Sequence, residues 1–358
     1  MRGADVMQES LFTTVQLESF VPANHPIRPL RELFNTALKR ISYLFDAAYA
    51  DGGRESIAPE RLLRAQLLQV LYSIRSERQL VEQMHYNLLF RWFVGLSIDD
   101  GVWNHSTFSK NRDRLLEHEV VPELFAEVVR LAEQRGMLSK DHFSVDGTLI
   151  QAWASHKSFR PKDDDGPGGI GRNQEHDFRG EQRKNDTHES TTDPDARLYR
   201  KSGNTAAVLC YQGHTVVENR NGLVVRALVS HATGTAERDT ALKLLESLPG
   251  GRRKTVGADK GFDVASFVEG CRSLRITAHV AAKDKGSAID QRTQRHDGYA
   301  ISQRKRKRVE EPFGWGKLIG QLRQVKQRGK ARVNALFKMS MIGWNLVRMR
   351  NILAMGAQ

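Results

Sequence analysis

Cysteine is nearly absent from this chain of 358 residues, which has only Cys210 and Cys271. Two cysteines without a Cys-x-x-Cys pair exclude a disulfide scaffold and a cysteine-based zinc module. The 12 histidines show no His-Glu-x-x-His spacing, so a zinc hydrolase of that kind is not indicated. Because disulfides are rare in reducing compartments, we expect a cytoplasmic protein.

Long apolar runs are missing as well. No stretch of about 18 apolar residues occurs, so a membrane span is not predicted. The first residues, MRGADVMQESLF, lack the apolar segment of a signal peptide. Apolar residues still make up 39% of the chain, which is enough for a folded core. The length predicts about two domains.

Acidic residues are scarce in the last sixth of the chain. Residues 301–358 carry 14 lysines or arginines but only two acids, Glu310 and Glu311. Nearly all of the formal net charge of +13 therefore lies there. Such a segment predicts a polyanionic partner, with nucleic acid first and an anionic membrane surface second. A solvated face on a basic protein is the alternative.

The first 138 residues predict an all-helical domain. After Pro59, the residues Leu63, Leu67 and Leu71 follow helical spacing. A second helix is expected over 122–135, because Gly136 stands where helices usually stop.

Between these helices lies HSTFSKNRDRLL, residues 105–116. It begins with capping candidates and continues with Lys110, Arg112 and Arg114. This pattern fits the recognition helix of a helix-turn-helix. It fits an ordinary amphipathic helix with a basic outer face equally well.

From residue 139 the pattern alternates between strands and helices, which predicts an α/β fold with a mixed sheet. We expect a strand from His142, a hairpin around Asn221-Gly222, a helix over 236–247, a strand over 254–262, a helix over 264–274, a strand over 276–280 and helices from Arg304. The stretch 155–204 is polar and poor in apolar residues, so a disordered insertion is predicted there.

Three carboxylates stand out by context. Asp146 lies inside an apolar strand, Asp259 closes the strand TVGAD, and Glu310 follows a run of five basic residues. Each one alone fits a turn or a cap. A strand-embedded aspartate is costly unless it is paired or bound to a metal. Together with the basic segment, the three predict a site for Mg²⁺ or Mn²⁺ that carries out phosphoryl transfer.

Helical spacing distinguishes the two adjacent glutamates. On an ideal helix Arg306, Glu310 and Lys317 fall within about 40° of one another, whereas Glu311 points about 100° away. Pro312 leaves two alternatives open: the helix is kinked there, or it begins near Glu311 with the proline in its first turn.

The segments FSVDGTLIQAWAS, VGADKGFD and RKRKRVEEPFGWGK, in this order, resemble the three signature regions of bacterial insertion-sequence DDE transposases. Arg306, Glu310 and Lys317 match the family pattern of arginine, three residues, glutamate, six residues and lysine. Where members often carry a tyrosine, this chain has Gln303. The helical segments HPIRPLRELF and HSTFSKNRDRL are similar to the family too, so the resemblance covers most of the chain.

The resemblance implies a ribonuclease-H-like mixed sheet with flanking helices over residues 139–358, preceded by a helical domain over 1–138 that binds DNA ends. It implies that Asp146, Asp259 and Glu310 are catalytic and hold two divalent metal ions, Mg²⁺ with Mn²⁺ as a substitute. The implied reaction is cleavage at the terminal inverted repeats of an insertion sequence, followed by joining of the 3′ ends to target DNA.

The expected partners are DNA, as element ends and as target, and further copies of the chain in a homo-oligomer, a dimer on DNA. The expected DNA-binding residues are Lys110, Arg112, Arg114, Arg304, Lys305, Arg306 and Lys317. Two alternatives stay open from the residues alone: a metal-dependent nuclease without strand transfer, and a non-catalytic DNA-binding protein.

Overall fold

The computed structural model describes residues 16–49, 56–162, 183–250 and 253–356. Within these ranges the first part of the chain is helical, which confirms the prediction. Its helices are α1 (Leu17–Phe20), α2 (Ile27–Arg40), α3 (Ser42–Ala48), α4 (Pro59–Leu71), α5 (Glu77–Tyr86), α6 (Leu88–Val94), α7 (His105–Glu117) and α8 (Val120–Gln134). None of the described helices is both long enough and apolar enough to cross a bilayer.

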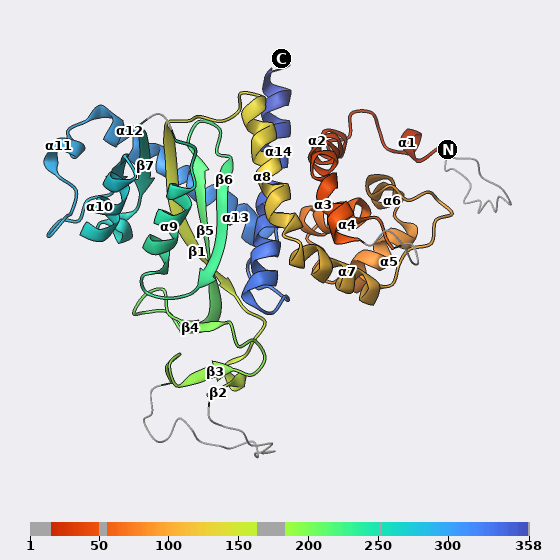
Figure 1. The fold of residues 1–358 in the computed structure, drawn as a ribbon, viewed down its shortest axis with the longest axis horizontal. Helices are drawn as coiled ribbons and strands as arrows, with labels where there is room; N and C mark the ends of the chain where they lie inside the picture. Colours follow the sequence, from red (N-terminus) through yellow and green to blue (C-terminus); the bar gives the residue numbers. More distant parts are fainter. Residues whose placement is uncertain (1–15, 50–55, 163–182, 251–252, 357–358) are drawn as a thin grey trace, which may run out of the picture.

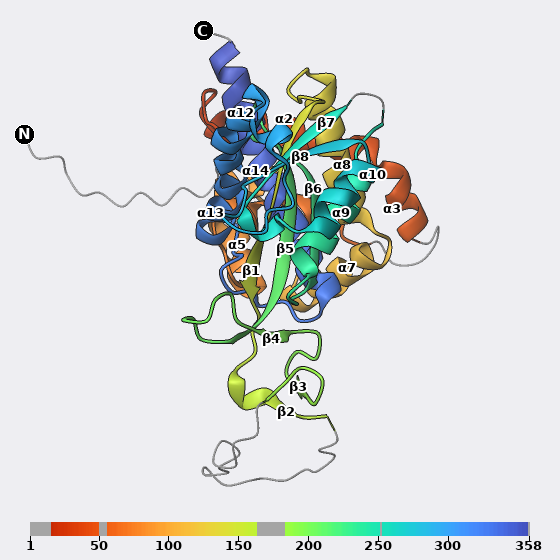
Figure 2. The ribbon, with the colours of Figure 1, turned by 90° about the vertical axis from the view of Figure 1, so that its left-hand side faces the viewer.

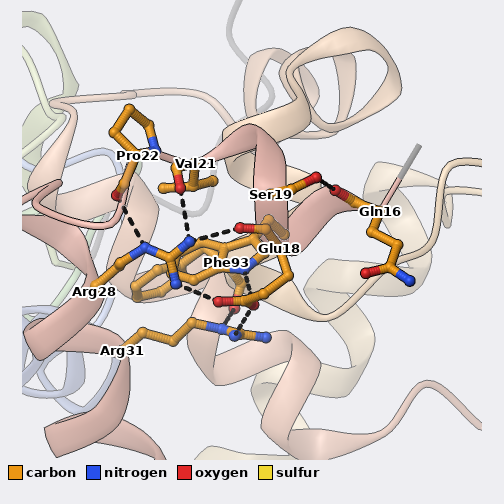
Figure 3. Close-up of polar contacts among 9 residues, drawn as sticks. Gln16, Glu18, Ser19, Val21, Pro22, Arg28, Arg31 and Phe93 are labelled. Carbon is orange, nitrogen blue, oxygen red and sulfur yellow. Dashed lines mark hydrogen bonds and ion pairs between the residues drawn. The ribbon is translucent and has the colours of Figure 1, made fainter.

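A polar cluster that includes Glu18, Arg28 and Arg31 joins α1 to α2 and α6 (Figure 3). Glu18 accepts a hydrogen bond of 2.7 Å from the Trp92 indole nitrogen. Arg28 and Arg31 lie over the indole ring, 5.0 and 4.3 Å from its centroid. Arg28 also donates to the backbone oxygen of Val21. The arginines of HPIRPLRELF are therefore used to hold the fold together.

The second part of the chain contains one mixed sheet. Its strands are β1 (His142–Gln151), β4 (Arg197–Tyr199), β5 (Val208–Glu218), β6 (Val224–His231), β7 (Lys254–Ala258) and β8 (Ile276–Val280). β5 pairs antiparallel with β1, β4 and β6, and β7 runs parallel to both β1 and β8. The predicted hairpin is confirmed, with Gly222 at a φ of 73° in its turn. The strand expected over 254–262 is shorter, because a 3₁₀ turn over Lys260–Phe262 follows β7.

Helices cover the sheet on both faces (Figures 1 and 2). They are α9 (Ala236–Glu246), α10 (Ala265–Ser273), α11 (Gln291–Gln294), α12 (Asp297–Lys305), the 3₁₀ turn η3 (Arg306–Val309), α13 (Glu310–Leu318) and α14 (Lys330–Gly356). One core joins Val145 and Val216 of the sheet to Leu244 of α9 and to Phe267 of α10. This is the ribonuclease-H-like arrangement that was predicted. Cys210 and Cys271 are buried and unpaired.

Helix α14 lies between the sheet and the N-terminal helices (Figure 1). Asn345 serves as the pairing partner that the edge strand β6 lacks: its amide accepts from the Val224 nitrogen (2.9 Å) and donates to the Val224 oxygen (2.8 Å). Asn334 accepts from the Val229 nitrogen in the same way. Residues of α14, the sheet and the N-terminal helices belong to a single hydrophobic core.

Parts of the stretch 155–204, which is predicted as a disordered insertion, form defined elements where the structure describes them. These parts contain the 3₁₀ turn η1 (His156–Ser158), β2 (Phe159–Pro161), β3 (His188–Ser190) and β4. In both views β2 and β3 lie beyond the end of β1 (Figures 1 and 2). Buried Asp193 anchors this region, because it accepts from the Tyr211 hydroxyl (2.7 Å) and the Gly329 nitrogen (3.1 Å). Phe159 and Ala196 of this region are also buried in the hydrophobic core. Residues 163–182 lie outside the described residues.

Candidate active site

The two aspartates singled out from the sequence stand on adjacent parallel strands. Ser144 of β1 pairs with Gly257 of β7, and Asp146 and Asp259 each follow two residues later. They therefore reach the same level of the sheet. Asp146 accepts a hydrogen bond from the nitrogen of its neighbour Gly147 (2.8 Å). Asp259 accepts one of 2.8 Å from the Gly261 nitrogen and so caps the turn after β7.

The electrostatic setting of Asp146 suits a bound cation. The pKa of its carboxyl is raised to about 7, mainly by burial; the Gly147 hydrogen bond opposes this rise, and the negative charges of Asp259 and Glu237 contribute to it. A buried carboxylate beside others of the same sign is stabilised by a positive ion. Carboxylate oxygens are also the ligands that Mg²⁺ and Mn²⁺ prefer, so these residues fit the metals that the family implies.

Arg306 packs directly against β7 near the aspartates. A Cβ on Gly257 would lie 3.5 Å from the Arg306 Cβ, an ordinary van der Waals distance, so Arg306 lies against this strand position. The Nε of Arg306 is buried and has no hydrogen-bond partner among the described residues. A phosphate oxygen would satisfy it.

Lys317 of α13 lies close enough to Asp146 for the two charges to interact. Burial lowers the pKa of its ammonium group, the positive charges of Lys201 and Arg323 lower it further, and the negative charge of Asp146 raises it. The signature lysine and the first aspartate therefore interact across the site, although 171 residues separate them in sequence.

Glu310 is the first residue of α13, and Pro312 lies in the first turn of that helix. This settles the alternative that the sequence left open in favour of a helix that begins at the glutamates. Glu310 is exposed. Within the described ranges, no three His, Cys, Asp or Glu side chains lie close enough together to hold a metal ion. The structure thus brings Asp146 and Asp259 together, while ligation by Glu310 stays a prediction.

The other predicted DNA-binding residues differ in their exposure and in their contacts. Arg112 forms ion pairs with Glu77 and Asp113, so it has an internal role in the N-terminal region. Lys110 and Arg114 are exposed on α7, on the far side of α14 from the sheet (Figure 1). Arg304 and Lys305 are exposed at the end of α12.

A polar groove of about 440 Å³ opens beside Lys317. It is lined by Ser73, Arg75, Gln151, Lys317, Leu318, Ile319, Gln321, Arg323 and Gln324. Among these residues three are basic and none is acidic, so the groove suits an anionic ligand. A larger cavity, about 630 Å³, lies between α8, β6 and α9, but it contains none of the carboxylates and is mainly apolar.

Sequence reasoning missed Glu237, whose carboxylate interacts electrostatically with both Asp146 and Asp259. It stands in the first turn of α9. An acid there is an ordinary complement to the helix dipole, so the local sequence gives no signal of a site.

A ribonuclease-H-like sheet with two aspartates at one level of adjacent parallel strands places the chain among enzymes that act on nucleic acid. Residues 138–346 match the family described as "Transposase DDE domain", and residues 15–114 match "Transposase domain (DUF772)". The first match spans more than half of the chain, which therefore belongs to the DDE transposase family. Its members cleave DNA and transfer strands with divalent metals.

The solved structures that match the chain are distant in sequence, and their TM-scores are below 0.5. A piggyBac transposase in a synaptic complex with hairpin DNA is 10% identical, with a TM-score of 0.42; the match covers 92% of this chain and 76% of that one. A Mos1 strand transfer complex is 11% identical with a TM-score of 0.21, covering 80% and 86%. A Mos1 mariner paired end complex with Mn is 11% identical with a TM-score of 0.21, covering 89% and 86%.

Proposed function

We propose that this chain is the transposase of an insertion sequence, which cuts at the element's terminal inverted repeats and joins the freed 3′ ends to target DNA. The observation that carries the proposal is the placement of Asp146 and Asp259 at one level of adjacent strands, with the charge of Lys317 interacting with Asp146, inside the DDE domain. Carboxylates with a cation opposite them suit the transfer of a phosphoryl group.

Asp146, Asp259 and Glu310 would hold two Mg²⁺ ions, with Mn²⁺ as a substitute. When bound, such ions activate an attacking oxygen and stabilise a leaving oxygen. The residues of the chain contribute the rest. The rigid strands fix the two aspartates, and Arg306 and Lys317 bind oxygens of the DNA phosphate that reacts.

DNA contacts divide between the two parts of the chain. Lys110 and Arg114, exposed on α7, contribute to recognition of the element ends. Arg304 and Lys305 bind the DNA backbone without regard to sequence, because they are exposed within the most basic segment. The active form is a homo-oligomer, a dimer that holds two ends.

The test incubates purified protein and Mg²⁺ with element-end DNA and a target plasmid. We expect nicks with 3′-hydroxyl ends and joined products. Asp146→Asn and Asp259→Asn should slow cleavage by about a thousandfold or more while DNA binding stays intact, because the reacting group loses its electrostatic stabilisation. Asp141→Asn, an exposed acid just before β1, is the matched control and should stay active.

Two results would contradict the proposal. Cleavage without joined products would make the chain a nuclease. Full cleavage by Asp146→Asn would remove the carboxylates from the chemistry.

A further inference from the structure

We propose that Glu237 is a positioning residue of the metal centre: its carboxylate holds the water shell of the cation bound by Asp146 and Asp259. This inference rests on the proposed function. Glu237 lies outside the three signature segments, on α9, which packs on the sheet.

Glu237 lies directly over the backbone next to Asp146. A Cβ added to Gly147 would come within 2.7 Å of both Cγ and Oε1 of Glu237. Such a distance is shorter than any ordinary contact, so only glycine at this strand position leaves room for the glutamate. The absence of a side chain after Asp146 thus creates the place that Glu237 fills.

The same turn of α9 is tied to the second aspartate. Arg238 donates to the Gly261 oxygen (3.4 Å), and the Gly261 nitrogen donates to Asp259. Arg238 also donates to the Gly234 oxygen, so its guanidinium group is used on backbone carbonyls. Glu237 is therefore held between the backbone that follows Asp146 and the turn that Asp259 caps.

Beside the Glu237 carboxylate lies the side-chain amide of Gln212 of β5, a residue that is only 3% exposed. Its Oε1 has no partner among the described residues. A water of the cation's shell would satisfy this oxygen, because such water is a strong hydrogen-bond donor.

The role is an indirect one. No three acidic, His or Cys side chains in the described chain come close enough to bind one ion together, so Glu237 is not assigned as a direct ligand. Mg²⁺ commonly keeps several waters, and partners that hold them change metal affinity about 10- to 100-fold. The negative charge of Glu237 complements the positive charge of a cation bound by Asp146 and Asp259.

The test measures Mn²⁺ binding to the full-length, DNA-free protein by electron paramagnetic resonance of the free ion. We expect Glu237→Gln to weaken binding about tenfold or more. Asp239→Asn, an exposed acid two residues along the same helix, should leave it unchanged. Half-maximal cleavage should need about tenfold more Mg²⁺ in Glu237→Gln, with most of the maximal rate recovered at saturation.

A second pair of variants tests the contact itself. Gly147→Ala should weaken Mn²⁺ binding, because the new methyl group displaces the carboxylate. In a Glu237→Ala background the same change should cost little more, since the space is already empty. Equal losses in both backgrounds would overturn the inference.

The role of Glu237 and the metal site itself can be tested separately. If Asp146→Asn abolishes Mn²⁺ binding but Glu237→Gln binds Mn²⁺ normally and is merely less stable to heat, Glu237 is structural and the proposed function stands. If Asp146→Asn binds Mn²⁺ normally as well, the proposed metal site itself is wrong.

Discussion

At the scale of single residues, Glu310 and Glu311 show how neighbours in sequence are given different surroundings. Glu310 begins α13 on the exposed face that leads to Lys317. The Oε2 of Glu311 instead lies near Gly222, in the turn of the β5–β6 hairpin. Arg348 lies near the same glycine and donates to a backbone oxygen of that turn. Glu311 is therefore directed toward the hairpin turn.

We predict that Glu310→Gln abolishes cleavage in both Mg²⁺ and Mn²⁺, because an amide cannot supply the anionic oxygen that the metal requires. Glu311→Gln should keep most activity and change stability by at most about 0.5 kcal/mol, as is usual for an exposed side chain. Cleavage assays with each metal, together with urea unfolding, measure both effects. The reverse ranking of the two variants would place the metal ligand one residue along.

At the scale of elements, a buried hydrogen-bonded triad of Ser302, His142 and His279 fixes α12, the helix that precedes η3 and Glu310. Ser302 of α12 is fully buried and bridges two histidines, His279 of β8 (2.6 Å) and His142 of β1 (2.7 Å). Burial lowers the pKa of His279 to about 4, with a further contribution from the charge of His142. Burial likewise lowers the pKa of His142, aided by the charge of Lys305.

This triad predicts that the free energy of unfolding falls in acid. The folded state favours neutral His279, so its contribution to stability is fully present above the ordinary pKa of 6.5 and is lost as the pH falls toward about 4. Each such histidine adds up to about 1.4 kcal/mol per pH unit to the slope of the unfolding free energy. Urea unfolding between pH 7.5 and 4.5 should show a smaller slope in His279→Gln than in the unaltered protein.

Exposed His118 provides the control, since His118→Gln should keep the original slope. If the pH dependence of the unfolding free energy is the same in His279→Gln as in the unaltered protein, protonation of His279 is not coupled to unfolding.

At the scale of the whole molecule, local patterns predicted most elements but few of the long-range contacts. The Asn-Gly turn and the spacing of apolar residues identified the hairpin, α4 and β8, because each of these signals is contained in a few neighbouring residues. The order around Asp193 was missed, because it arises from hydrogen bonds to Tyr211 and Gly329. Glu237 was missed for the same reason: its proximity to the aspartates comes from packing of α9, which no local pattern encodes.

The helical N-terminal part and the sheet are linked through α13 and α14. A Cβ on Gly343 of α14 would lie 3.2 Å from Val70 of α4 and 3.0 Å from Trp315 of α13, so these three elements meet closely. Gln321, in the loop between α13 and α14, donates to backbone oxygens of Gln69 and Ile74. The boundary near residue 138 therefore separates two sequence patterns that share a core.

This shared core predicts that residues 139–358 do not fold stably alone. Without the N-terminal helices, the face of α14 around Gly343 would be open to water, at a cost of about 25 cal/mol for each Å² of apolar surface. We expect the fragment to aggregate or to bind a hydrophobic dye, and the full chain to unfold in a single transition in urea. Co-expression with residues 1–138 should restore a soluble complex, because the helices would cover α14 again. A fragment that unfolds cooperatively at the same urea concentration as the full chain would show instead that the catalytic part has an independent core.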